Sequence, residues 1–176
     1  NLIDATVEHY GRIDIAVFNA GGVANTSMVA DFSDEEWQYE MDFNINHCFW
    51  GTRRALKYML PQQYGRIINM SSMYGKITTP GVAGYITNKH AIIGFSKAAA
   101  HEVGIQGVTV NAVCPGEVDT PMLRAAGRAR PLTDEEAREM GDRVVPMGRL
   151  ARPAEIARMV LFLCSDEASY ITGAMH

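Results

Sequence analysis

Tyr85 and Lys89 stand four positions apart in the segment YITNK, inside a stretch that predicts a helix from about Tyr85 to Val103. Residues with this spacing lie on the same face of a helix. A free phenol has a pKa of about 10, too high for acid–base work at neutral pH, but a nearby ammonium group favours the phenolate and lowers that value. The pair therefore suits proton transfer with an alcohol or a ketone. Taken alone, the same spacing also fits an exposed Tyr–Lys pair on a helix surface.

Two further polar positions are candidates for the same chemistry. Ser72 follows an apolar run that predicts a strand, and a hydroxyl group there can hydrogen-bond a substrate oxygen or simply cap a turn. Ser71 is the alternative, and the spacing to Tyr85 favours Ser72. Asn44 lies in a long predicted helix, where an amide usually bonds backbone or water, and Asn46 is the second candidate there.

Short apolar strands alternate with longer helices along the chain. Three runs suit strands buried on both faces: Ile13–Phe18, Gly65–Ser71 and Val108–Val113. Capping boxes begin at Ser33 and Thr133, and Gly11 and Pro61 mark helix ends. The predicted helices are Asp4–Tyr10, Asp34–Leu60, Tyr85–Val103, a short one from Thr133 to about Gly141, and Pro153–Cys164.

Strands separated by helices of this length predict right-handed βαβ units in an α/β, Rossmann-like, doubly wound parallel sheet. Ligands bind such sheets at the carboxyl ends of the strands. The loops after Phe18, Ser71 and Val113 should therefore share one edge, and the chemistry is expected there.

Length and composition narrow the class of protein. The 176 residues, 47% of them hydrophobic, describe one globular domain with a packed core. A formal charge of −4 argues against nucleic acid as the main partner. Three cysteines without a CxxC motif indicate reduced thiols and a cytoplasmic protein. The five histidines show no metal-ligand spacing, and no apolar run is long enough to cross a membrane, so neither a metal nor a membrane is expected.

These residues resemble the short-chain dehydrogenase/reductase family, in its simple single-domain branch. FNAG at 18–21 is similar to the family's NNAG motif, with Phe18 in place of the first asparagine. Asn44, Ser72 and the Tyr85–Lys89 pair match the family's helix asparagine, its catalytic serine and its YxxxK motif. CPGEVDTP at 114–121 matches the PG motif, and GRLARPAE at 148–155 and SDEASYITG at 165–173 resemble tail segments. The likeness covers essentially the whole chain.

The resemblance implies an NAD(P)-dependent oxidoreductase acting on CH–OH groups, which interconverts a secondary alcohol and a ketone. Tyr85 is then the general acid or base, and Lys89 lowers its pKa and hydrogen-bonds the nicotinamide ribose. Ser72 polarises the substrate oxygen, and Asn44 extends a proton relay toward solvent. The cofactor is NAD or NADP. Besides Tyr85 and Lys89, the residues expected to line it are Asn19, Ala20, Gly21, Pro115, Gly116, Val118 and Thr120.

The sequence also departs from the family pattern. The Gly-rich turn that seats the cofactor pyrophosphate at a helix N-terminus is absent, and so is the next strand, whose end selects NAD or NADP. The family's terminal strand is missing after His176. The chain therefore looks like the central and C-terminal part of the enzyme, a single incomplete domain over 1–176 that lacks the N-terminal strands.

Specificity is expected from a lid at about 117–147, together with Met73, Tyr74 and the Thr79–Val82 loop. Their many apolar side chains favour a small or medium, largely apolar alcohol or ketone. Three arginines allow an anionic group instead, although neighbouring acids favour a solvated lid surface: Arg124, Arg128 and Arg130. The resemblance also implies a homo-oligomer, expected to be a tetramer, because the helix bearing Tyr85 is apolar nearly all round.

Two other classes of protein remain open. One is a lyase or dehalogenase on the same fold that uses no nicotinamide, against which Lys89 argues because that branch carries arginine there. The other is a non-catalytic relative that binds a dinucleotide, and such proteins often lose the tyrosine that this chain retains as Tyr85.

Overall fold

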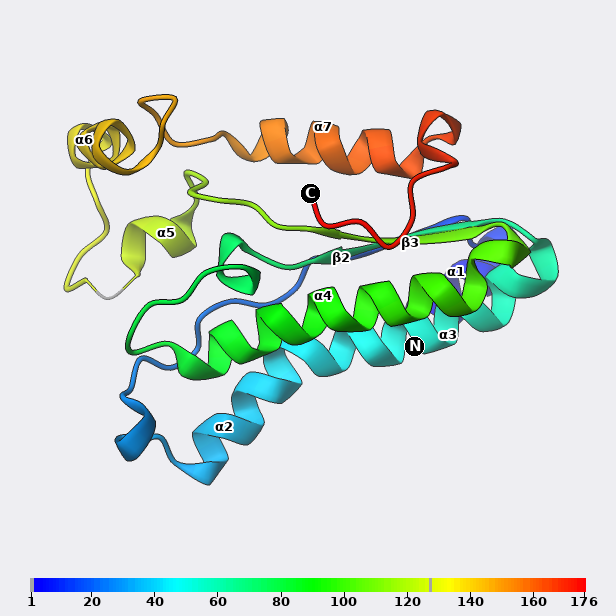
Figure 1. Ribbon diagram of the computed structural model, residues 1–176, viewed down its shortest axis with the longest axis horizontal. Helices are drawn as coiled ribbons and strands as arrows, with labels where there is room; N and C mark the ends of the chain where they lie inside the picture. The colour runs from blue at the N-terminus through cyan, green and yellow to red at the C-terminus, as the bar shows by residue number, and fades with distance from the viewer. Residues whose placement is uncertain (1, 127) are drawn as a thin grey trace.

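The computed structural model describes residues 2–126 and 128–176, and its centre is a three-stranded parallel sheet in the order β1-β2-β3 (Figure 1). The strands are β1 (Ile15–Phe18), β2 (Gly65–Met70) and β3 (Val108–Val113). Ile67 in the middle strand lies opposite Ala16 on one side and Val110 on the other. Because the strands are parallel, their carboxyl ends meet at one edge, at the left of Figure 1.

Helices cover both faces of this sheet, as a doubly wound fold requires (Figure 1). α3 (His47–Gln62) and α4 (Ala83–Val103) pack on the face that receives Ile67, and α7 (Pro153–Cys164) packs on the face that receives Ile68. β2 and β3 are buried at every residue, which explains their largely apolar character, and their polar members are buried as well: Arg66, Asn69, Thr109 and Asn111. The predicted α/β class is confirmed.

The remaining elements lie around this core. The other helices are α1 (Leu2–Tyr10), α2 (Asp34–Met41), α5 (Pro121–Ala125) and α6 (Asp134–Val144). The short turns are η1 (Val29–Asp31), η2 (Asp42–Asn46), η3 (Met73–Gly75), η4 (Gly104–Gln106) and η5 (Asp166–Ala168). Both predicted capping boxes are present, at Ser33 and Thr133.

The long helix predicted over Asp34–Leu60 is interrupted. η2 is a π-helical turn that separates α2 from α3, and such turns are frequent at functional sites. α3 also continues past Leu60 and includes Pro61 in its last turn. It ends where Gln63 adopts a left-handed conformation, with φ 51°, and donates its backbone N–H to the carbonyls of Leu60 and Met59.

β1 differs from the buried strand predicted over Ile13–Phe18. It begins at Ile15, because the backbone N–H and C=O of Ile13 bond the side-chain amide of Gln62 instead. Ala16 is buried, but Ile15 and Val17 are 48% and 42% exposed. β1 is an outer strand of the described sheet, and one of its faces packs while the other remains open.

The last residues of the chain pair with β3 through an isolated bridge between Ala112 and Met175. Gly173 donates its N–H to the carbonyl of Val110, and Ala112 donates to the carbonyl of Ala174. His176 then donates to Ala112 and accepts from Cys114 at 2.7 Å. Residues 173–176 thus lie parallel beside β3 without forming a further strand of the described sheet, as the sequence predicts.

Other boundaries shift for local reasons. α4 begins at Ala83 rather than at Tyr85, and α6 runs to Val144 rather than Gly141. The stretch 118–130, which has no clear periodicity, contains α5. Thr120 caps that helix through its side chain, with a proline at the first helical position, a signal that the sequence does carry.

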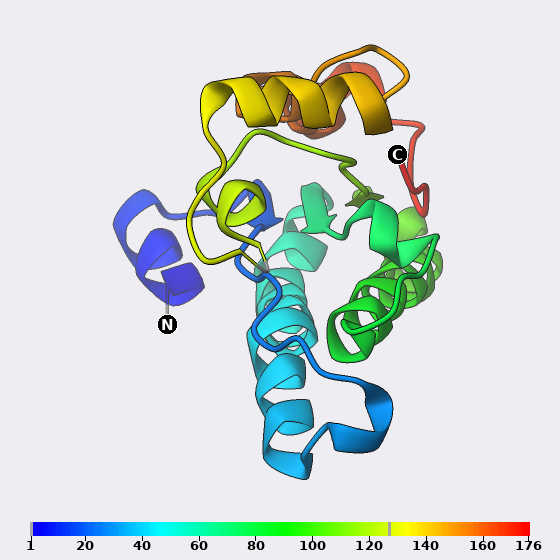
Figure 2. The same cartoon turned by 90° about the vertical axis from the view of Figure 1, so that its left-hand side faces the viewer.

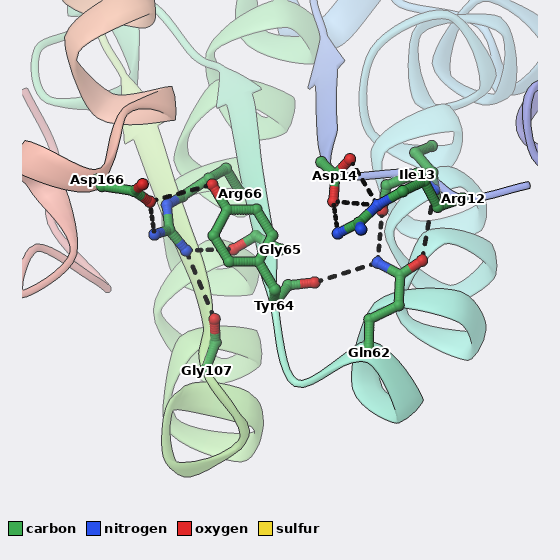
Figure 3. Close-up of polar contacts among 9 residues, drawn as sticks. All are labelled: Arg12, Ile13, Asp14, Gln62, Tyr64, Gly65, Arg66, Gly107 and Asp166. Atoms are coloured by element: carbon green, nitrogen blue, oxygen red, sulfur yellow. Dashed lines mark hydrogen bonds and ion pairs between the residues drawn. The ribbon is translucent and has the colours of Figure 1, made fainter. Parts of the chain in front are cut away.

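Polar contacts tie the amino ends of the strands together, on the opposite edge from the expected site (Figure 3). Arg66 stacks over the ring of Tyr64 at 4.4 Å and donates to Asp166 at 3.1 Å. Gln62 joins the end of α3 to Ile13 with a bond of 2.9 Å. Neither a membrane-crossing helix nor a His, Cys, Asp or Glu cluster suited to a metal occurs in the part of the chain that the structure describes.

Candidate active site

The segments after β2 and β3 meet at the carboxyl edge of the sheet, which faces the viewer in Figure 2. Ser71 donates its backbone N–H to the carbonyl of Val113 at 2.7 Å, and Met73 donates to the carbonyl of Pro115 at 2.8 Å. These bonds hold the serine-bearing segment against the segment with the PG motif. In Figure 2, α5 (yellow-green) lies in front of this edge and α6 (yellow) lies above it.

Tyr85 and Lys89 project toward this edge from the first turns of α4, and both side chains are buried. The Lys89 Nζ lies 5.3 Å from the centroid of the Tyr85 ring and donates to the carbonyl of Met70 at 2.9 Å. The ring of Tyr74, from η3, meets the Tyr85 ring edge-on at 6.3 Å between centroids. The helical spacing thus brings phenol and ammonium together at the end of β2.

Burial acts on both groups. It lowers the pKa of Lys89 to about 8, and it raises the pKa of Tyr85 above its usual 10. Interaction with the Ser72 hydroxyl works against that rise, while the negative charge of Glu40 adds to it. The expected lowering of the Tyr85 pKa by Lys89 is therefore not what this structure gives, because desolvation of the phenol is the largest effect.

The two candidate serines have different surroundings. Ser71 donates its hydroxyl to the backbone carbonyl of Lys89 at 2.8 Å, which fastens β2 to α4. Ser72 accepts the backbone N–H of Tyr74 at 3.2 Å, and its hydroxyl faces the phenol of Tyr85, with which it interacts as a hydrogen-bond donor. Of the two, only Ser72 has its hydroxyl directed at the tyrosine.

Asn44 lies in the π-helical turn and is fully buried. Its side-chain oxygen accepts the N–H of Gly22 at 3.0 Å, and its NH2 group donates to the carbonyl of Gly22 at 3.1 Å and to the Glu40 carboxylate at 2.8 Å. The amide thus holds the loop after β1. Asn46, the second candidate, bonds the Asp42 side chain instead.

The predicted cofactor residues gather along the same edge. Asn19 and Ala20 are exposed at the end of β1, and Gly116 is exposed after β3. Gly21 has a φ of 131°, and a Cβ there would lie 2.8 Å from the Asn44 Oδ1, so the position requires glycine. Thr120 accepts the N–H of Leu123 as a helix cap.

Sequence reasoning missed Glu40, which lies one helical turn before Asn44 and has no exposed surface. It also missed Asn88, which donates to the backbone carbonyls of Glu40 and Gly84. The spacing of four between Glu40 and Asn44 on a predicted helix was the available signal.

A doubly wound parallel sheet with a serine, a tyrosine and a lysine converging on its carboxyl edge defines an α/β enzyme of the Rossmann type. Comparison with known proteins narrows the class. Residues 1–176 match the family model described as Enoyl-(Acyl carrier protein) reductase.

Two curated relatives are 3-oxoacyl-(acyl-carrier-protein) reductases named FabG. The one from Thermotoga maritima is 36% identical over 98% of this chain and 67% of its own length. The one from Vibrio cholerae is 40% identical over the same shares. The chain thus spans about two thirds of the length of these relatives.

Two solved structures of reductases are also similar to this chain. A variant of actinorhodin polyketide ketoreductase, solved with NADPH, matches with a TM-score of 0.90 and 37% identity over 99% of this chain and 69% of that one. Levodione reductase matches with a TM-score of 0.91 and 32% identity over 98% and 67%. The chain therefore belongs to the short-chain dehydrogenase/reductase family, as its motifs predict, and the expectation of NAD or NADP as the cofactor agrees with the NADPH in the ketoreductase.

Proposed function

We propose that the protein is an NAD(P)-dependent ketoreductase that interconverts a ketone and a secondary alcohol, with Tyr85 as its general acid or base. The observation that carries this proposal is the convergence of the Tyr85 phenol, the Ser72 hydroxyl and the Lys89 ammonium at the carboxyl edge of the sheet. The curated relatives named as 3-oxoacyl-(acyl-carrier-protein) reductases support the direction of ketone reduction.

Each of the three groups has a role at the substrate oxygen. Burial keeps the Tyr85 phenol protonated at neutral pH, which suits a group that donates a proton to a carbonyl oxygen. Ser72, whose hydroxyl interacts with the Tyr85 phenol, would donate a hydrogen bond to the same substrate oxygen and orient it. The Lys89 charge then stabilises the phenolate that remains on Tyr85 after the transfer. A relay of protons through Asn44 remains a prediction.

The described residues fit the part of a nicotinamide dinucleotide that the family places at this edge. Lys89 has three donor hydrogens and bonds one acceptor, the Met70 carbonyl, which leaves donors for ribose hydroxyl groups. A Cβ at Gly116 would meet nothing within 4 Å, so the backbone there is open to close approach. With Asn19, Ala20, Gly21, Tyr85, Pro115, Val118 and Thr120 these residues would hold the cofactor, which supplies or accepts the hydride when bound.

The substrate is a small molecule, and we assign its specificity to the lid at about 117–147, of which residue 127 lies outside the described residues. Arg124 bonds Asp119 and Asp134, and Arg130 bonds Glu136. These ion pairs satisfy the arginines within the lid, which supports a largely apolar substrate over an anionic one.

The assembly is proposed to be a homotetramer. α4 exposes small residues along one side, and a Cβ at Gly94 would meet nothing within 4 Å. On the neighbouring α3, Phe49 and Trp50 are 41% and 51% exposed. Such a surface suits helix-on-helix contact with a second copy. The three free cysteines favour a reducing compartment, for which we propose the cytoplasm.

Steady-state assays of the full-length protein with NADH and NADPH against a panel of ketones and β-ketothioesters test the proposal. Wild-type protein should oxidise one of the two cofactors in a ketone-dependent manner. Tyr85→Phe should abolish most of that turnover, whereas Tyr170→Phe, at a fully exposed tyrosine, should leave it unchanged. A folded Tyr85→Phe protein with wild-type turnover would rule out the proposed acid.

A further inference from the structure

Glu40 is a carboxylate buried in the interior, where its charge acts on Lys89 without a direct ion pair. It has no exposed surface, and it forms no ion pair with any Lys, Arg or His in residues 2–126 and 128–176. Burying a charge in this way is costly unless hydrogen-bond donors compensate it. An apolar side chain of similar size would avoid that cost, so the carboxylate indicates a need for its acceptor oxygens.

Both oxygens of Glu40 are used. Oε1 accepts the backbone N–H groups of Ala24 and Asn25, each at 3.0 Å, and Oε2 accepts the side-chain NH2 of Asn44 at 2.8 Å. The first two bonds reach the loop after β1, residues 19–25, which we call the cofactor loop. The third bond fixes the side-chain amide of Asn44, which accepts the N–H of Gly22 and donates to its carbonyl in the same loop. Glu40 therefore restrains the cofactor loop directly at one end and through Asn44 in the middle.

Glu40 is also linked to α4, the helix that bears Tyr85 and Lys89. Asn88 donates its side-chain NH2 to the backbone carbonyl of Glu40 at 3.0 Å and to that of Gly84 at 2.9 Å. Asn88 lies between Tyr85 and Lys89 on α4. A Cβ at Gly84 would lie 2.9 Å from the Glu40 Cγ, so the two helices are in close contact. Glu40 thus connects the helix that bears Tyr85 and Lys89 with the cofactor loop.

We propose that Glu40 is a positioning residue, which sets the cofactor loop through Ala24, Asn25 and Asn44 for binding of the nicotinamide dinucleotide. The proposal rests on the proposed function, because it assigns the loop to that cofactor. It predicts that loss of the acceptor oxygens weakens cofactor binding more than it slows the chemical step.

Glu40→Gln is the sharpest perturbation. Glutamine keeps the size of the side chain and can accept from Ala24 and Asn25 with its oxygen, but its NH2 group then faces the NH2 group of Asn44. If the glutamine amide adopts the flipped orientation, its NH2 group instead faces the backbone N–H groups of Ala24 and Asn25, which then lack an acceptor. Glu40→Met is the second variant, since it removes every acceptor yet keeps an apolar side chain of similar length that the interior tolerates. Glu35→Gln, at an exposed position of the same helix, is the matched control.

Three measurements on the full-length protein separate positioning from general stability. Calorimetric titration with NADPH and NADH gives the dissociation constants, and steady-state kinetics gives the cofactor KM and kcat. Hydrogen exchange followed by mass spectrometry measures how fast the backbone amides of the cofactor loop exchange with solvent. We expect Glu40→Gln and Glu40→Met to raise the dissociation constant and KM about tenfold or more, with a much smaller change in kcat. Exchange should accelerate in peptides covering residues 19–25 and remain at the wild-type rate in β2 and β3.

Wild-type affinity and wild-type exchange of the loop in a folded variant would overturn the proposal. So would exchange that accelerates equally throughout the chain, or failure of both variants to fold, because either result describes a purely structural residue. If the wild-type protein binds neither nucleotide, the proposed function fails instead. The loop-exchange result then still decides whether Glu40 positions that loop.

Discussion

The buried ammonium of Lys89 makes the stability of the protein depend on pH in a way that a single substitution can isolate. Burial lowers the pKa of Lys89 from 10.5 to about 8. Between these two values the unfolded chain binds more protons than the folded one, so the free energy of unfolding rises with pH. Burial of the ammonium therefore destabilises the fold by about 3 kcal/mol below pH 8, and this cost is relieved as the pH rises to 10.5.

Lys89→Met removes this dependence. The stability of wild type minus that of the variant should move in favour of wild type by about 1 kcal/mol between pH 7.5 and pH 9.0. The thiol of Cys48 works in the opposite direction, because burial raises its pKa from 9.0 to about 11 and its contribution is lost as pH rises. The thiol titrates in both proteins, so its own desolvation cancels in the difference, whereas its charge interaction with Lys89 does not.

Urea unfolding of the full-length protein, with a thiol reductant present, measures the four stabilities. Lys97→Met is the control, because Lys97 is exposed on the same helix. The free energy of unfolding of Lys97→Met should change between pH 7.5 and pH 9.0 by the same amount as that of wild type. If the difference between wild type and Lys89→Met is the same at pH 7.5 and pH 9.0, the ammonium is not desolvated as the structure indicates, and the reasoning about the site's electrostatics is wrong.

Three further substitutions test separate parts of the site. Tyr85→Phe should lower kcat by about 10²- to 10⁴-fold without changing the circular dichroism spectrum, because only the proton-transferring hydroxyl group is lost. Gly21→Ala should lower both thermal stability and cofactor affinity, since its φ of 131° disfavours alanine and the new Cβ would lie 2.8 Å from the Asn44 Oδ1; wild-type affinity would contradict this. Thr133→Ala should destabilise the lid by about 1 kcal/mol through loss of the capping box with Glu136, seen as faster hydrogen exchange in α6 alone.

Strong local patterns made most of the fold predictable. Mostly apolar runs indicated β2 and β3, because both faces of these strands are covered, and capping residues indicated the starts of α2 and α6. The π-helical turn at 42–46 was not predictable. It depends on side-chain amides that bond backbone from distant segments, as Asn88 does with Glu40.

The site was predictable where spacing alone determines proximity. Tyr85 and Lys89 share a helix face whatever surrounds them, and the parallel strands bring Ser72 to the same edge. The sequence could not give the electrostatic balance, because the pKa of Tyr85 depends on how deeply the fold buries the ring. Nor could it show that the side chain of Asn44 is committed to Gly22, since that contact joins segments on different elements.

Burial acts on the two central groups of the site in complementary ways. It raises the pKa of Tyr85, so the phenol keeps its proton at neutral pH, and it lowers the pKa of Lys89 to about 8, so the ammonium is still mostly charged there. A proton donor next to a cation is the arrangement that ketone reduction needs, because the phenol must give up its proton and the cation then stabilises the phenolate. Alcohol oxidation needs the phenolate at the start, and burial opposes it. The same desolvation that contradicts a lowered tyrosine pKa therefore suits the proposed role of Tyr85 as a proton donor.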